Sequence, residues 1–124
     1  MKRKQVLGCL VVLLALIAGP AMADIVDDGA GNITVSGDND GHVGATDNTT
    51  VTVNSGASLT ATMSTVAFDG DNNTLINRGT ITSGANGVLV NYDNDAATIQ
   101  GQTVTNYGTI SGLTGINFCT DPLV

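Results

Sequence analysis

An internal repeat limits the folds that this chain can adopt. Residues 74–81 (TLINRGTI) match residues 103–110 (TVTNYGTI) at a shift of 29, and residues 83–88 (SGANGV) match residues 111–116 (SGLTGI) at a shift of 28. A weaker copy, residues 50–57 (TVTVNSGA), precedes both. Periods of roughly 20–50 residues are typical of solenoids and related arrays. The sequence therefore predicts stacked copies of one short structural unit.

Each copy combines short strands, rich in Thr or apolar residues, with an Asn-x-Gly tripeptide that begins at Asn54, Asn77 or Asn106. Glycine adopts positive φ without a Cβ clash, and asparagine tolerates the left-handed region. The tripeptide therefore predicts a bend rather than the interior of a strand. Two or three short strands with their corners fill about 20–28 residues, which matches the spacing of the copies.

Such a unit buries its small apolar face only against the next copy, at about 4.8 Å between strands. Equivalent residues should then form columns, and the three bend asparagines should form an amide ladder. The expected apolar columns are Val51–Leu75–Val104, Ile81–Ile110 and Val88–Ile116. The repeat thus predicts an all-β fold, a parallel β-solenoid of about three coils.

The alternative is an antiparallel sandwich, which also uses many short strands separated by turns. A sandwich needs no sequence repeat and usually draws on larger aromatic residues for its core. This chain has two Phe, two Tyr and no Trp, so we favour the solenoid.

Residues 1–23 have the pattern of a cleaved secretory signal peptide. Three basic residues precede an apolar run at residues 6–18, and a Gly-Pro break leads to small residues before Asp24. The run is shorter than the roughly 20 residues that a membrane span needs. The rest of the chain divides into an irregular N-terminal cap region at 24–48, solenoid repeats at 49–118 and a short tail at 119–124.

The charge of the chain restricts its partners. All 11 acidic residues are Asp, and Arg78 is the only Lys or Arg after residue 23, which gives the predicted mature chain a net charge of −10. Phosphate contacts need Lys and Arg, so nucleic-acid binding is excluded. Membrane insertion of the mature chain is not expected either.

Few residues are candidates for catalysis. His42 is the only histidine and lies in a Gly-rich stretch with several Asp, as a solvated loop residue would. Cys119 is the only cysteine after the signal segment, and no serine lies in a Gly-x-Ser-x-Gly elbow. We therefore expect no catalysis and no resident cofactor.

Calcium is the best hypothesis for a small ion. Asp47, Asp71 and Asp95 recur at a spacing of 24, so stacked turns would bring three carboxylates together. Such carboxylates repel one another unless they face water or share a cation. We prefer the alternative, in which all three are exposed turn residues that favour the turn and solubility.

Residues 69–81 (DGDNNTLINRGTI), with their echo at 103–110, resemble the passenger repeats of bacterial autotransporters, the type V secreted surface proteins of Gram-negative bacteria. The resemblance covers residues 49–118. It implies a right-handed parallel β-helix at the cell surface, commonly with an adhesive role. The partners would then be host or bacterial surface molecules.

Autotransporter passengers are followed by a translocator barrel of many strands of about ten residues, for which this chain has no room. We therefore expect a truncated N-terminal part of a longer gene product, which would encode that barrel. The chain would be exported through the inner membrane to the periplasm, the cell surface or the medium.

The leading hypothesis is an adhesin-like passenger fragment with a structural or interaction role. The alternatives are a small secreted calcium-dependent binding module and a fragment of a carbohydrate-active β-helix enzyme. The enzyme is disfavoured because no Lys follows residue 4.

Overall fold

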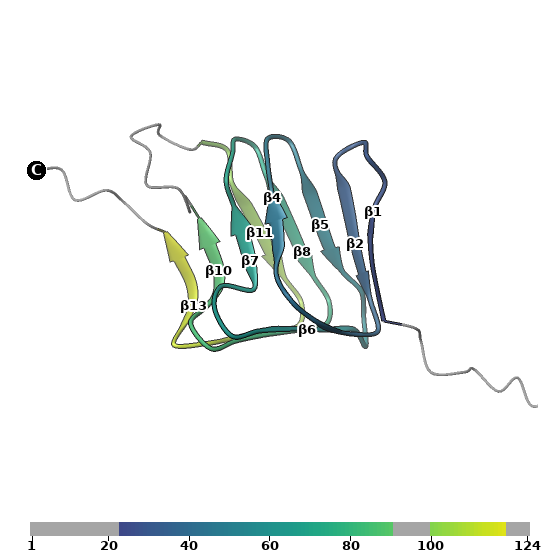
Figure 1. The fold of residues 1–124 in the computed structure, drawn as a ribbon. Helices are drawn as coiled ribbons and strands as arrows, with labels where there is room; N and C mark the ends of the chain where they lie inside the picture. Colours follow the sequence, from purple (N-terminus) through teal and green to yellow (C-terminus); the bar gives the residue numbers. More distant parts are fainter. Residues whose placement is uncertain (1–22, 91–99, 119–124) are drawn as a thin grey trace, which may run out of the picture.

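The computed structural model describes residues 23–90 and 100–118, and this part of the chain contains 13 β-strands and no helix (Figure 1). No segment of it is a helix with the length and apolar character needed to cross a membrane. Residues 1–22 of the predicted signal peptide, Asp95 and the predicted tail lie outside the described residues. The strands are β1 (Asp24–Asp27), β2 (Asn32–Ser36), β3 (Asp38–Asp40), β4 (Val43–Ala45), β5 (Thr50–Val53), β6 (Ser58–Ala61), β7 (Val66–Phe68), β8 (Thr74–Asn77), β9 (Thr80–Ser83), β10 (Asn86–Val90), β11 (Thr103–Asn106), β12 (Thr109–Ser111) and β13 (Thr114–Phe118).

The strands form three sheets, and successive strands visit the sheets in a fixed order. Sheet A has the order β1-β2-β5-β8-β11, sheet B the order β12-β9-β6-β3, and sheet C the order β13-β10-β7-β4. All neighbours pair in parallel except β1 and β2, which are antiparallel. The predicted all-β class is confirmed, and the strand order is consistent with a β-helix-like solenoid.

Each consecutive set of three strands contributes one strand to every sheet, and we call such a set a tier. Tier 1 is β2–β4, tier 2 is β5–β7, tier 3 is β8–β10 and tier 4 is β11–β13. The tiers lie next to one another along the molecule, with β1 at one end and β13 at the other (Figure 1).

The described part contains four tiers, one more than the three that the repeat predicts. The additional tier lies within residues 24–48, where we expected an irregular cap, because β2, β3 and β4 pair with β5, β6 and β7. A strand can join this stack in parallel if its alternate, inward-facing residues are apolar. Ile33 and Val35 meet this requirement in β2, although the corner that follows β2 has Ser36-Gly37 where the later copies have Asn-x-Gly.

The predicted apolar columns are confirmed by the register. Leu75 pairs with Val51 on one side and Val104 on the other, and both Ile81 and Val88 pair with their predicted partners. These columns form the core because alternate residues of a strand point to opposite faces of its sheet. Adding the neighbouring strands, the columns are Ile33–Val51–Leu75–Val104, Leu59–Ile81–Ile110 and Val43–Val66–Val88–Ile116.

The predicted asparagine ladder is confirmed for two of its three members. Asn77 pairs with Asn106, and its Nδ2 donates to Asn106 Oδ1 at 2.8 Å. Asn54 was wrongly included, because Val53 is the residue paired with Asn77. The alternating sequence of β5 (TVTV) directs Val53 inward, so Asn54 already belongs to the corner. There its Nδ2 donates to Ser36 Oγ at 3.0 Å.

Two bend glycines are needed for a reason other than the predicted positive φ. Neither Gly79 nor Gly108 has a positive φ, whereas Asn48 and Asn72, in the Asp-Asn turns, have φ of 57° and 58°. A Cβ at Gly79 would collide with the Ala57 carbonyl, and one at Gly108 would collide with the Gly79 carbonyl. The close approach of stacked corners therefore excludes a side chain at these two positions.

The first prediction compares Asn77 with Asn54. Asn77 is fully buried, its Nδ2 also donates to the Thr109 carbonyl at 3.0 Å, and its Oδ1 accepts from Gly79 N at 3.1 Å. We expect Asn77→Ala to lower the free energy of unfolding by about 3 kcal/mol, because it leaves buried backbone groups without partners. Asn54→Ala should cost about 1 kcal/mol. Denaturant titration measures both, and equal losses would contradict the assigned register.

The second prediction compares two glycines. Gly79→Ala should destabilise the fold by about 1–3 kcal/mol, because the new Cβ forces the tier-2 and tier-3 corners apart. Gly44→Ala is the matched control, since a Cβ at Gly44 meets no heavy atom within 4 Å. We expect Gly44→Ala to change the unfolding free energy by less than about 0.5 kcal/mol. Thermal melts of the two variants test this difference.

Candidate functional site: a groove between sheets B and C

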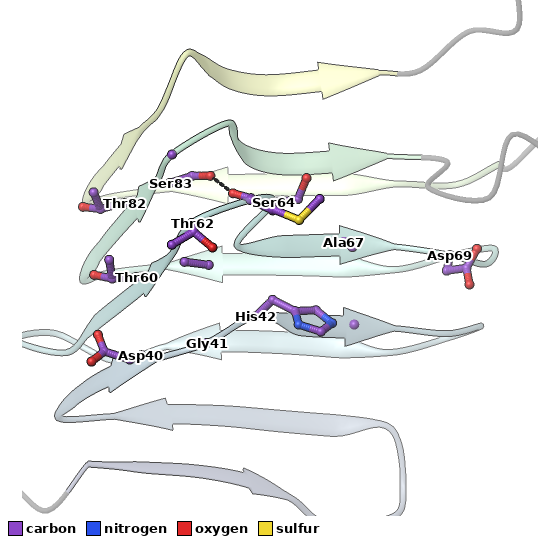
Figure 2. A pocket seen from close by; sticks show the side chains of 14 residues that line it. Asp40, Gly41, His42, Thr60, Thr62, Ser64, Ala67, Asp69, Thr82 and Ser83 are labelled. Carbon is purple, nitrogen blue, oxygen red and sulfur yellow. Dashed lines mark hydrogen bonds between the residues drawn. The ribbon is translucent and has the colours of Figure 1, made fainter.

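A groove of about 990 Å³ lies at the corner where sheet B passes into sheet C (Figure 2). Its residues come from tiers 1, 2 and 3, so the groove runs across the stack rather than within one tier. Most of its side chains are small, and many carry hydroxyl groups. The lining residues are Asp40, Gly41, His42, Gly44, Thr60, Ala61, Thr62, Met63, Ser64, Ala67, Asp69, Thr82, Ser83 and Gly84.

A straight row of oxygen-bearing side chains lies on the sheet B side of the groove. Asp40 pairs with Thr60, and Thr60 pairs with Thr82, so the three residues occupy the same position in successive tiers. All three are exposed, since their neighbours in each strand take the inward-facing positions. The row presents carboxylate and hydroxyl oxygens at intervals of about 4.8 Å.

The corner between β6 and β7 forms a wall of the groove. It contains four residues, 62–65, whereas the equivalent corners contain two, at 41–42 and 84–85. Ser83 Oγ donates to the Met63 carbonyl (Figure 2). Thr65 Oγ1 donates to the Thr82 carbonyl at 2.9 Å. Tier 3 thus holds this longer corner in place, with the Met63 side chain 68% exposed.

The floor of the groove is hollow because sheet C carries very small residues there. Gly44 of β4 pairs with Ala67 of β7, and both lie between inward-facing neighbours. The Gly44 backbone and the Ala67 methyl group therefore face the outer side of the sheet, where a Cβ at Gly44 would meet no heavy atom within 4 Å and Ala67 is 7% exposed. The groove combines this apolar floor with polar walls.

The groove contains negative charges and no positive ones. Asp40 and Asp69 line it, and no Lys or Arg does. Arg78 lies instead at the corner between β8 and β9, over the Tyr107 ring at 5.6 Å from its centroid. The field of the groove therefore favours neutral or cationic ligands over anionic ones.

His42 lies in the groove, exposed, as the sequence predicts for a solvated residue. In the described part of the chain, its ring forms no hydrogen bond with a hydroxyl or a carboxylate. Figure 2 shows it on the tier-1 side of the groove, near the start of β4. The absence of catalysis stays a prediction.

The calcium candidates Asp47 and Asp71 lie in turns outside the groove and bind backbone groups. Asp47 Oδ1 accepts from Asp71 N, and Asp71 Oδ1 accepts from Gln100 N, both at 2.8 Å. The residue stacked on Asp71 is therefore Gln100, not the Asp95 that a constant spacing of 24 predicts. No group of three or more His, Cys, Asp or Glu suited to a metal ion occurs within residues 23–90 and 100–118.

Asp28 has a perturbed carboxyl group in the turn between β1 and β2, remote in sequence from the groove. The Asn32 side-chain amide and the backbone N–H groups of Asn32 and Ala30 donate to it. These bonds stabilise the charged form, and they hold the pKa of Asp28 below its ordinary value of 3.8. Asp28 therefore keeps its negative charge to a lower pH than an unperturbed aspartate does.

The sequence reasoning missed most of the groove. Thr60, Thr82 and Met63 received no attention because threonine is abundant and Met63 lies between repeat copies. One signal was available: the residues that follow β6 match neither later copy, which indicates a corner of different length. Such a corner protrudes when its neighbours stack regularly.

Comparisons of the chain with protein-family models, with curated proteins and with solved structures found no match in any of the three. The fold and the groove are therefore interpreted from the residues of this chain. The resemblance of residues 69–81 and 103–110 to autotransporter passengers stays a prediction.

The third prediction concerns the wall of the groove. Ser83→Ala should lower the free energy of unfolding by about 1–2 kcal/mol, because the Met63 carbonyl loses its hydrogen bond. Backbone amides of residues 62–65 should also exchange faster with deuterated solvent. Thr80→Ala is the control, since Thr80 is exposed in the same strand and its side chain forms no hydrogen bond in the described part. Unchanged exchange at 62–65 would show that Ser83 does not hold the wall.

Proposed function

We propose that the chain is an exported, adhesin-like surface protein, with a structural and binding role and no catalysis. Its strands would form a right-handed parallel β-helix of the autotransporter passenger type. The fixed order of sheets through four tiers supports the coil. Right-handed crossovers predominate between parallel strands, which supports the hand. The signal-like residues 1–23 support export.

The observation that carries the binding role is the groove with its row Asp40–Thr60–Thr82. Hydroxyl and carboxylate oxygens can exchange hydrogen bonds with the hydroxyl groups of a sugar. The apolar floor and Met63 can cover the less polar face of a sugar ring, as in pockets that combine apolar walls with a few placed polar groups. We therefore propose an uncharged glycan of a host or bacterial surface as the ligand.

The groove extends over three tiers, which suits a polymer better than a single small molecule. An anionic polysaccharide would meet Asp40 and Asp69 without any base in the groove to neutralise it. The same charge argument disfavours a carbohydrate-active β-helix enzyme that cuts acidic polysaccharides. The proposed role is therefore attachment to a neutral surface polymer.

The fourth prediction tests this role by filling the groove. The full chain is attached to fluorescent beads, and the beads bound to epithelial cells and to bacteria are counted before and after enzymatic removal of surface glycans. We expect Gly44→Trp to reduce binding at least about tenfold, since its side chain would occupy the open floor. Removal of the glycans should reduce the binding of the unchanged chain to the same level.

The matched control is Thr52→Trp, which places the same side chain on the outer face of β5 in sheet A, away from the groove. This variant should bind as the unchanged chain does, and circular dichroism should show that both variants are folded. Binding that is insensitive to Gly44→Trp and to glycan removal would refute the proposed role of the groove.

A further inference from the structure

The outer face of sheet A carries threonine at most of its positions. In β5 the buried Val51 and Val53 face the core, so Thr50 and Thr52 face outward. The register between tiers extends these two outward positions into two columns of residues. The columns are Asn32–Thr50–Thr74–Thr103 and Thr34–Thr52–Ile76–Thr105. Six of these eight positions are therefore threonine.

The two columns form a lattice that is regular in two directions. Neighbouring strands lie about 4.8 Å apart, and residues i and i+2 of one strand lie about 6.6 Å apart. The pairing runs residue by residue from β2 through β5 and β8 to β11, so no slip interrupts the spacing. Threonine is stiff at χ1 because it branches at Cβ. A stiff side chain on a regular lattice loses little conformational entropy when it binds a regular partner.

The lattice is uncharged. None of its eight positions is Asp, Lys or Arg, although the chain after residue 23 has a net charge of −10. The six threonine hydroxyl groups form no hydrogen bond with any other residue within 23–90 and 100–118. At the edge of the sheet, β1 adds Val26 beside Thr34 and Asp24 beside Ser36. This acidic residue thus lies outside the two columns.

The other two sheets have no comparable outer face in the part of the chain that the structure describes. The outward positions of sheet B include the acidic residues Asp38 and Asp40. Sheet C has a single outward column without a hydroxyl group, Gly44–Ala67–Leu89–Asn117. Sheet A therefore combines a regular row of hydroxyl groups in every tier with the absence of charge.

A lattice of this kind suits a partner that is itself periodic in two directions. A small ligand or a peptide would contact only a few positions, so it would not need the same residue type in tier after tier. An ionic mineral would need charged side chains, which the two columns lack. The surface of ice is periodic, uncharged and made of hydrogen-bonding oxygen atoms. The repeats of its oxygen lattice are similar in size to the two spacings of sheet A.

Threonine has the two chemical groups that an ice surface needs. Its hydroxyl group donates one hydrogen bond and accepts two, so it can take the place of a water molecule at the edge of the ice lattice. Its methyl group is apolar and restricts the orientations of the water beside it. A face that repeats both groups at lattice spacing therefore orders water in the pattern of the crystal.

We infer that the outer face of sheet A, across β2, β5, β8 and β11, binds the surface of ice. The bound chain stops the growth of the crystal at the point of contact. Ile76 replaces one hydroxyl group by an apolar side chain, and it adds no charge to the face. This inference is independent of the glycan-binding role of the groove, which is built from sheets B and C.

The fifth prediction tests this inference with the full chain in a dilute solution that freezes slowly onto a cooled probe. The chain should enter the growing ice, whereas an unrelated acidic protein of similar size stays in the liquid. Thr52→Trp should enter the ice at least about tenfold less, because its large side chain holds the lattice away from the crystal. Gly44→Trp is the matched control, since it places the same side chain in the groove. It should enter the ice as the unchanged chain does.

The same two variants separate ice binding from the proposed role of the groove. Gly44→Trp should lose binding to cells and keep binding to ice, and Thr52→Trp should show the reverse. Circular dichroism should show that both variants are folded. If Thr52→Trp does not fold, Thr74→Trp in the other column replaces it, with the same expected loss of ice binding.

Three results would overturn the inference. Exclusion of the unchanged chain from the ice shows that sheet A does not bind it. Equal incorporation of the unchanged chain and of folded Thr52→Trp places the contact on another surface. Sedimentation velocity that shows a dimer of the unchanged chain and a monomer of Thr52→Trp means that a second copy covers this face instead.

Discussion

The parallel hydrogen bonding of equivalent strands in neighbouring tiers is the interaction on which the rest of this structure depends. It holds residues of one kind in register, so that Val51, Leu75 and Val104 form one column and Asn77 meets Asn106. No single tier could bury these side chains, because one strand per sheet has no second layer to cover it. The core exists only as a property of the stack, which explains why small aliphatic residues suffice and few aromatics are needed.

The same constraint determines where the molecule can vary. A strand must match its neighbours in length and in alternation, whereas a corner need only return the chain to the next sheet. The corner at 62–65 is longer than its neighbours, and its displacement over the small residues Gly44 and Ala67 produces the groove. Where two corners stack closely, as at Gly79 and Gly108, even one Cβ is excluded. The groove and the positions that exclude a side chain thus both lie at corners between strands.

The predictions from sequence were correct where they rested on the alternation of inward-facing and outward-facing residues along a strand. They were wrong where they assumed a constant number of residues between equivalent positions in successive tiers. The apolar columns followed from alternation, and the structure confirms them. The inclusion of Asn54 in the ladder and the expected stacking of Asp95 on Asp71 both assumed constant corner lengths. A corner of four residues at 54–57, and a separation of 29 positions between Asp71 and Gln100, changed these pairings. Tier 1 was missed because its strands share alternation but no motif with the later copies.

The sequence by itself determined the all-β class, the parallel stacking and the composition of the core. These follow from the alternation of residues along each strand and from the internal repeat. It also determined the charge, and with it the classes of ligand that are disfavoured. Only the tertiary structure decided which corner protrudes and which oxygens form the row beside the groove. These features depend on which residues pair between neighbouring tiers. That register is determined by the lengths of the corners that precede each strand.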